Sequence, residues 1–168
     1  ALEIFKGNDW EFEPEKYMTR GEFASAVTLA AREVPVDPAL LKNTRTTATK
    51  KTAAAQEKAI FSDVPVGSRY FEAVDNAFKR NMISGVGGNL FEPEAPITVA
   101  DAITIFIRAL GLESLAPNPT AITSFRDNDE IPAWARNSVY VAERIGLIKG
   151  DDRGYIKPTS PLTKARAA

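Results

Sequence analysis

The sequence has 168 residues, 44% of them hydrophobic, and a formal net charge of −1, so it can bury a core but lacks the positive field that non-specific nucleic-acid binding requires. It contains no cysteine and no histidine, which excludes disulfides, thiolate and imidazole catalysis, and the usual zinc ligands. The longest apolar stretch, residues 102–112, is well short of the ~20 residues that a membrane span needs. We therefore expect a folded domain or compact repeat array with no nucleic-acid partner and no membrane insertion.

Five segments follow one another along the chain. Residues 1–34 hold a Gly-containing turn and then a helical pattern, and residues 35–60, rich in Thr, Ala and Lys, indicate an insertion. Residues 61–113 predict a helix, a Gly-rich turn and a second helix. Residues 125–168 predict the same order with a truncated second helix, and residues 114–124 link the two units. The first unit lacks a leading helix and the third stops as its second helix should begin, which predicts self-association or contact with flanking sequence.

One spacing is common to the three helical units. In each, a large apolar residue is followed two positions later by a proline, and a threonine comes five positions after that proline: Phe12, Pro14 and Thr19; Phe91, Pro93 and Thr98; Ile156, Pro158 and Thr163. Chance does not explain such agreement, so these are internal repeats. We expect three helix pairs packed around one core.

These residues resemble the S-layer homology family, whose repeats contain F-x-D-V, W-A, G-[IL]-[IV]-x-G, G-x-F-x-P and [IL]-T-R-A-E. The third unit follows this pattern closely through Phe125, Asp127, Trp134, Ala135, Gly146 to Gly150, Gly154 and Pro158, whereas the second has Arg69 where the family usually has Trp. The resemblance covers the chain apart from residues 35–60.

The resemblance implies an all-α fold of tandem helix-loop-helix repeats in a pseudo-threefold arrangement around a shared helical core. It implies a non-covalent anchoring module of a bacterial surface protein, outside the cell at the cell wall or S-layer, with grooves between repeats. These grooves would bind secondary cell-wall polysaccharide, often carrying pyruvate ketals on N-acetylmannosamine. No cofactor is implied.

The repeated threonines predict helix starts. Thr19 with Glu22, and Thr98 with Asp101, match a capping box or a close relative, and Thr163 would cap the third helix although Arg166 replaces the acid there.

The cations beside these threonines indicate a different role. Arg20 and Lys164 fall in the first helical turn, where the helix dipole disfavours a cation by ~0.3–1 kcal/mol. Free N–H groups beside such a cation suit a carboxylate, although a solvated cation paired with a nearby acid explains the pattern equally well. The resemblance favours binding, with Arg20 as the leading residue and a weak site at Val99.

The complete set of candidate polysaccharide-binding residues is Arg20, Lys164, Trp134, Arg69, Lys6, Lys149, Glu22, Asp101, Gly7, Gly85 and Gly150. Trp134 could stack on a sugar, but a single Trp at the start of an amphipathic helix is more often part of the core. The glycines are more often conformational, and the acids near Asp127 and Asp151 lack the spacing of a calcium loop, so we expect no metal.

Two other functions remain open. The repeats could pack against copies of themselves, as a self-assembly module of a surface layer. A carboxylate-based polysaccharide-degrading enzyme would need two acids facing each other across the scissile bond, and the acids here are explained as caps, turns or helix surface. We expect a module that is not an enzyme.

Overall fold

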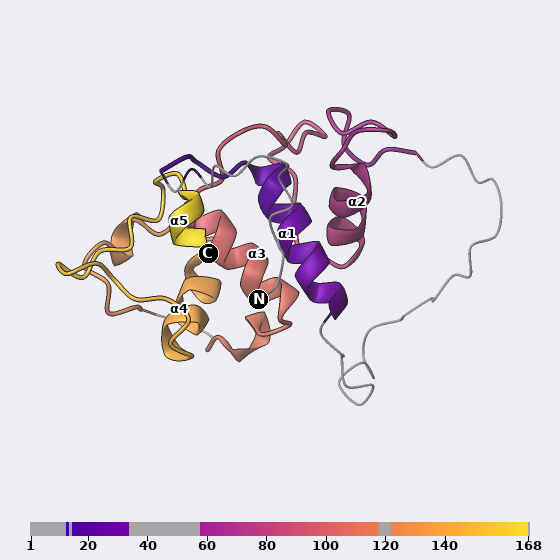
Figure 1. The fold of residues 1–168 in the computed structure, drawn as a ribbon. Coiled ribbons are helices and arrows are strands. Elements are labelled where there is room, and N and C mark those ends of the chain that lie inside the picture. The colour runs from indigo at the N-terminus through magenta and orange to yellow at the C-terminus, as the bar shows by residue number, and fades with distance from the viewer. Residues whose placement is uncertain (1–12, 14, 34–57, 118–121, 168) are drawn as a thin grey trace.

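The computed structural model describes residues 13, 15–33, 58–117 and 122–167 (Figure 1). Helices and turns make up these residues, and no β-strand occurs among them, so the all-α prediction is confirmed for this part of the chain. Most of the predicted insertion, residues 35–60, lies outside the described residues, as do Lys6 and Gly7. In the described part, no helix is long and apolar enough to cross a membrane.

The helices follow the repeats. They are α1 (Arg20–Glu33), α2 (Phe71–Lys79), α3 (Val99–Ala109), α4 (Arg136–Arg144) and the short α5 (Lys164–Ala167), with the 3-10 helices η2 (Glu113–Leu115) and η3 (Asn128–Glu130) between them. The second helices of the three repeats are α1, α3 and α5. The first helices of the second and third repeats are α2 and α4.

Three helices end in the same way. After α2, α3 and α4 the chain enters the left-handed region at Asn81 (φ 57°), Gly111 (φ 70°) and Gly146 (φ 74°). The next amide then donates back into the helix, as from Met82 to the carbonyl of Ala77 at 2.9 Å and from Leu147 to that of Ala142 at 2.8 Å. This capping satisfies carbonyls that the helix leaves free, and it ends each helix sharply.

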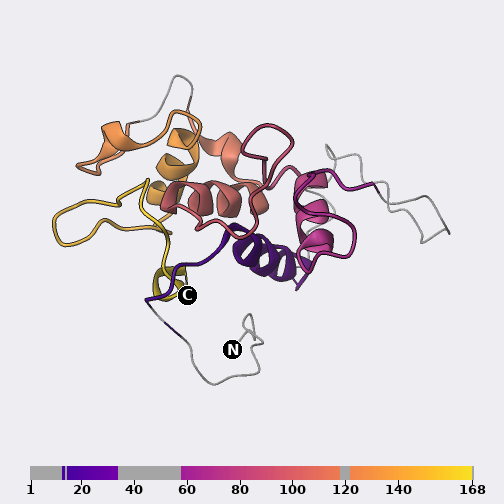
Figure 2. The same cartoon turned by 90° about the horizontal axis from the view of Figure 1, so that it is seen from above.

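The packed helix pairs combine neighbouring repeats. Helix α1 packs against α2, α3 packs against α4, and α1 and α3 also pack on each other (Figures 1 and 2). A Cβ added at Gly21 would lie 2.8 Å from the Tyr70 ring, so the absent side chain lets α1 and the start of α2 approach closely. Two of the three expected helix pairs are therefore present among the described residues. Both form between repeats, because the long segment joining the two helices within a repeat carries its second helix to the next unit.

A ring of backbone hydrogen bonds joins the three repeats at their centre. The amide of Met18 donates to the carbonyl of Leu162 (2.9 Å), that of Leu162 to Ile97 (2.8 Å), and that of Ile97 to Met18 (2.9 Å). All three side chains are buried in the core. Three isolated antiparallel bridges surround this ring, pairing Tyr17 with Thr163, Thr19 with Pro96, and Thr98 with Pro161. Every repeat therefore contacts both of the others.

An aspartate holds the turn of each later repeat. The Asp63 carboxylate accepts from the amides of Phe91 (2.9 Å) and Glu92 (2.7 Å). Asp127 does the same for Ile156 (3.2 Å) and Lys157 (2.7 Å). Each aspartate thus links the start of its repeat to the turn before the second helix through charge-assisted hydrogen bonds to backbone amides.

Candidate functional site

Helix α1 begins with a reciprocal cap that places Arg20. The Thr19 amide donates to Glu22 Oε2 at 2.9 Å, and the Glu22 amide donates to Thr19 Oγ1 at 3.2 Å. At α3 the Asp101 amide donates to Thr98 Oγ1 at 3.1 Å, while the Thr98 hydroxyl donates to the Asp101 carboxylate at 2.6 Å. Both helix starts are therefore fixed, together with the residues in their first turns.

The Arg20 side chain crosses from the first repeat into the second. Its Nε donates to the Phe91 carbonyl at 2.9 Å, and one terminal nitrogen lies 3.4 Å from the Ser84 carbonyl. The other terminal nitrogen is 3.2 Å from an Asp101 carboxylate oxygen, and the guanidinium carbon lies 4.9 Å from the centroid of the Phe91 ring. Arg20 is only 7% exposed, so it joins two repeats as a buried charge.

These contacts explain how a cation is tolerated at the start of α1. The Asp101 carboxylate and two carbonyls offset the unfavourable helix dipole. A guanidinium has five N–H donors, and these contacts use three of them.

A cavity of about 410 Å³ opens beside Arg20. Residues of all three repeats line it: Arg20 from the first, Ser84, Gly85, Val86, Asp101, Thr104, Ile105 and Arg108 from the second, and Trp134 from the third. The structure therefore brings four sequence candidates together, namely Arg20, Gly85, Asp101 and Trp134. We refer to this cavity as the inter-repeat groove.

Trp134 is 52% exposed. The expectation that it belongs to the core is wrong, because it precedes α4, in the turn where Ala135 fills the buried position instead. Its ring lines the inter-repeat groove, where an exposed indole offers an apolar face beside charged groups.

Sequence reasoning missed Arg108, Ser84 and Thr104. Arg108 donates from Nε to the Glu113 carboxylate at 3.2 Å, and one terminal nitrogen lies 3.4 Å from the Ser84 hydroxyl. A signal was present, since Asp101, Thr104, Ile105 and Arg108 follow the i, i+3, i+4, i+7 spacing of one helix face. That stripe is the wall of the groove that α3 provides.

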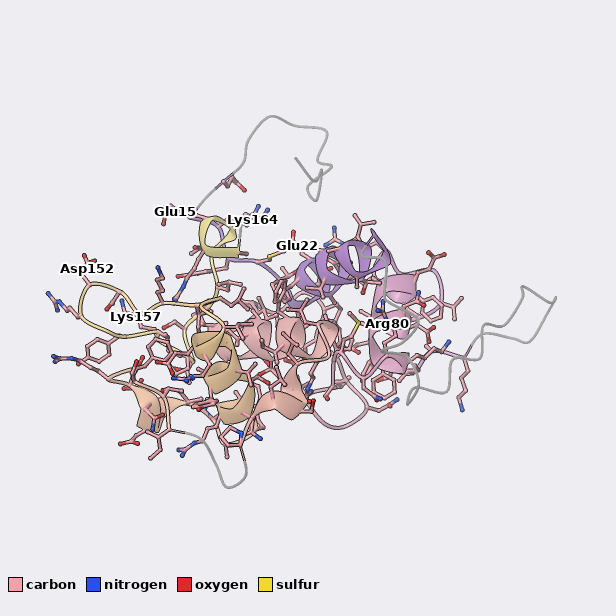
Figure 3. All side chains as sticks on the ribbon, turned by 90° about the horizontal axis from the view of Figure 1, so that it is seen from below. Glu15, Glu22, Arg80, Asp152, Lys157 and Lys164 are labelled. Atoms are coloured by element: carbon pink, nitrogen blue, oxygen red, sulfur yellow. The ribbon has the colours of Figure 1, made fainter. Side chains whose placement is uncertain are left out.

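The other candidates lie outside this groove. Lys164 Nζ lies 4.0 Å from Glu22 Oε1, and Figure 3 shows the two side chains together between α5 and α1. Lys149 is exposed and Thr163 is half-buried. Lys6 and Gly7 are outside the described residues.

Arg69 is exposed and engaged elsewhere. It lies 3.0 Å from the Glu94 carboxylate and over the Tyr70 ring. Its pKa is raised above the ordinary value, first by electrostatic interaction with Tyr70 and, after an opposing desolvation effect, by the hydrogen bond to Glu94.

Two candidate glycines are needed where the backbone approaches other groups. A Cβ at Gly85 would lie 2.6 Å from the Phe61 ring and 2.7 Å from the Leu90 carbonyl oxygen. A Cβ at Gly150 would lie 2.8 Å from the backbone of Gly154. Both positions exclude a side chain, which explains glycine there without a ligand.

Comparison with known proteins places these residues in a family context. The S-layer homology domain family matches residues 1–24, 60–103 and 124–168. The exoglucanase XynX of Acetivibrio thermocellus is 32% identical over 161 residues, which are 95% of this chain and 13% of that protein. An amylopullulanase of Thermoanaerobacterium thermosulfurigenes is 30% identical over 161 residues, 95% of this chain and 8% of that protein.

A protein named for the S-layer is also similar. The S-layer protein EA1 of Bacillus anthracis is 27% identical over 108 residues, which are 64% of this chain and 12% of that protein. The chain thus spans 13% or less of the length of each of these three relatives.

Proposed function

Because the chain belongs to the S-layer homology domain family, we propose that it is a non-covalent anchoring module that attaches a larger protein to the bacterial cell surface. The relatives support this proposal, since they include S-layer proteins and long polysaccharide-degrading enzymes that share only a small part of their length with this chain. A short segment common to such different proteins is what a shared attachment module would produce.

The proposed fold is a pseudo-threefold arrangement of the repeats. It is supported by the ring of hydrogen bonds through Met18, Leu162 and Ile97, in which each repeat donates to one neighbour and accepts from the other. The matching bridges around the ring support the same arrangement.

The proposed ligand is an acidic cell-wall polysaccharide, with a pyruvate-ketal carboxylate as its charged group, bound in the inter-repeat groove. The observation that carries this proposal is that Arg20, Asp101 and Trp134, from three different repeats, line one cavity. The contacts of Arg20 with described residues use three of its five N–H donors, and Arg108 adds a second guanidinium to the groove. The exposed Trp134 ring would stack on a sugar face while the arginines hold the carboxylate.

We also propose that the chain itself is not catalytic. A glycosidase needs two carboxyl groups on either side of the scissile bond. Asp101 is the one carboxylate among the described residues that line the groove, and it is paired with Arg20. The enzyme activities in the relatives' names would then belong to other parts of those proteins.

Calorimetric titration with purified pyruvylated wall polymer, run beside the depyruvylated polymer, tests the ligand. Trp134→Ala and Arg108→Gln are the variants of choice because both change the groove without removing the buried Arg20. Arg80→Gln, an exposed cation at the end of α2 (Figure 3), is the matched control.

We expect affinity to fall at least tenfold for both groove variants and for the depyruvylated polymer, with no change for the control. If the two polymers bind with equal affinity, the pyruvate-ketal carboxylate is not the group that the chain recognises. If Trp134→Ala binds the pyruvylated polymer as tightly as the unchanged chain does, the inter-repeat groove is not the binding site.

A second candidate function is self-assembly. The segment between the second and third repeats exposes the large apolar side chains of Leu115 and Ile122, and such groups favour contact with another copy. Sedimentation of the chain without polymer over a range of concentrations tests this function. A concentration-independent monomer would exclude it.

A further inference from the structure

The turn of the third repeat forms a second hollow that shares no residue with the inter-repeat groove. Its volume is about 640 Å³, and it is lined by Arg126, Asp151, Asp152, Arg153, Tyr155 and Lys157. We call it the repeat-3 hollow. Figure 3 shows the loop with Asp152 and Lys157 standing out from the helices.

Backbone contacts hold the walls of this hollow in place. The Asp151 amide donates to the Tyr155 carbonyl at 2.8 Å, and the Arg126 amide donates to the Gly154 carbonyl at 3.0 Å. Gly154 has φ +83°, and a Cβ there would touch the Arg126 side chain at 3.6 Å, so this side chain lies along the loop. The residues that line the hollow are therefore presented by a closed loop.

The charge of Asp151 is used within the loop. Its Oδ1 accepts from the amides of Arg153 and Tyr155, each at 3.0 Å, and its other oxygen lies 3.6 Å from Lys157 Nζ. The pKa of Asp151 is lowered, first by the hydrogen bond from the Tyr155 amide. Asp151 is thus a structural anion that also neutralises Lys157.

Arg126 and Arg153 are the cations that remain. Both are exposed, and within the described part of the chain no carboxylate lies within 4.0 Å of either guanidinium. Tyr155 comes two residues after Arg153, is half-buried and lines the same hollow. Asp152, which Figure 3 shows at the outer end of the loop, is the remaining acid of the set.

The second repeat shows that these charges are not required by the fold. Its turn has the same backbone contact, from the Val86 amide to the Leu90 carbonyl at 2.9 Å, and the same aspartate tie from Asp63. The residues that match the repeat-3 set are Ser62, Val86, Gly87, Gly88, Leu90 and Glu92. The same turn structure thus carries two arginines and a tyrosine in the third repeat, and neither arginine nor tyrosine at the matching positions of the second.

We propose that the repeat-3 hollow is a second binding site, for an acidic sugar, in which Tyr155 stacks on the sugar ring and Arg126 and Arg153 hold its oxyanion. Guanidinium groups pair with carboxylate and phosphate through two parallel hydrogen bonds, and an aromatic ring beside them fits a sugar face. The site is independent of the groove, so either one can fail without the other.

Amide and arginine side-chain NMR spectra of the whole chain, titrated separately with glucuronate, glucose 6-phosphate and neutral glucose, test the site. We expect shifts at Arg126, Arg153 and Gly154 with one or both acidic sugars and none with glucose. Glucuronate alone would assign a carboxylate ligand, and glucose 6-phosphate alone a phosphate ligand. Equal shifts with glucose, or no shifts with any of the three, would overturn the proposal.

The test variants carry residues that the same scaffold holds in the second repeat. Arg126→Ser and Tyr155→Leu introduce the residues that the second repeat has at the matching positions. Each should weaken acidic-sugar binding about tenfold and leave the rest of the spectrum unchanged. Arg80→Gln is the matched control, because Arg80 is an exposed cation at the end of α2 that lines neither the groove nor the hollow. Shifts that survive Arg126→Ser and Tyr155→Leu undiminished would refute the assignment of the site.

Discussion

Replacing Arg166 tests whether the cation at the junction of the second and third repeats has moved to the other repeat, compared with the junction of the first and second. At the first junction, Arg20 reaches the Phe91 carbonyl and pairs with Asp101. At the second junction the matching positions hold Val99 and Arg166, and Arg166 donates from a terminal nitrogen to the Ile156 carbonyl at 2.9 Å. Phe91 and Ile156 occupy the same place in their repeats, so both carbonyls receive a guanidinium, but from opposite sides of the junction.

The size of the effect follows from burial. Ile156 is 0% exposed, and a buried acceptor left without a donor costs about 1–3 kcal/mol. Arg166 is itself exposed, so water can replace part of the bond, and we expect Arg166→Ala to cost about 1–2 kcal/mol. For a domain of this size that corresponds to a fall in Tm of roughly 2–8 °C.

The decisive variant is the double exchange Val99→Arg with Arg166→Asp, which rebuilds the arrangement of the first junction. Val99 is 3% exposed, so Val99→Arg alone loses apolar burial and brings a second cation toward Arg166. Arg166→Asp alone leaves the Ile156 carbonyl beside a carboxylate. Each single variant should therefore be destabilised, and the double variant should recover at least about 1 kcal/mol relative to the sum of the two.

Urea unfolding followed by circular dichroism gives the four free energies of this cycle. If the double variant loses as much unfolding free energy as the two single variants together, positions 99 and 166 do not interact and the proposed charge exchange is wrong. In that case Arg166 would be a surface cation whose bond contributes nothing specific.

Three further predictions concern the contacts that hold the repeats together. Gly21→Ala should destabilise the chain by about 1–3 kcal/mol, because the added methyl group would meet the Tyr70 ring at 2.8 Å, and thermal unfolding measures the loss. Asp127→Ala removes two amide acceptor contacts and should cost at least about 1.5–3 kcal/mol; an unchanged urea midpoint would contradict this role. The lowered pKa of Asp151 predicts loop order that persists above its ordinary pKa and is lost as pH falls through the lowered value. The amide shifts of Arg153 and Tyr155 during acid titration report this loss, and Asp151→Asn should remove the transition.

The sequence predicted local features well because its repeats carry them in short patterns. Thr19 with Glu22 and Thr98 with Asp101 identified two helix starts. These features depend on neighbours within a few residues, so spacing alone is informative.

Contacts between repeats could not be obtained in this way. The pattern around Arg20 indicated an unusual cation, but nothing local says that its partners are Phe91, Ser84 and Asp101. The exposure of Trp134 was misjudged for the same reason, since the composition of a helix start does not tell which side the rest of the chain covers. Only the arrangement of all three repeats decides both.

The hydrogen bonds at the centre also constrain the order in which the molecule can fold. The contacts of Met18 with Leu162 and of Lys164 with Lys16 join residues separated by nearly the whole sequence. Local helices form quickly, but such long-range closure carries a large loss of chain entropy and slows folding. The first two repeats can therefore complete their central hydrogen bonds only once the third repeat is present, because Leu162, the partner of Met18, belongs to it. Unlike a linear array of stacked units, this chain should not fold by adding one finished repeat to the next.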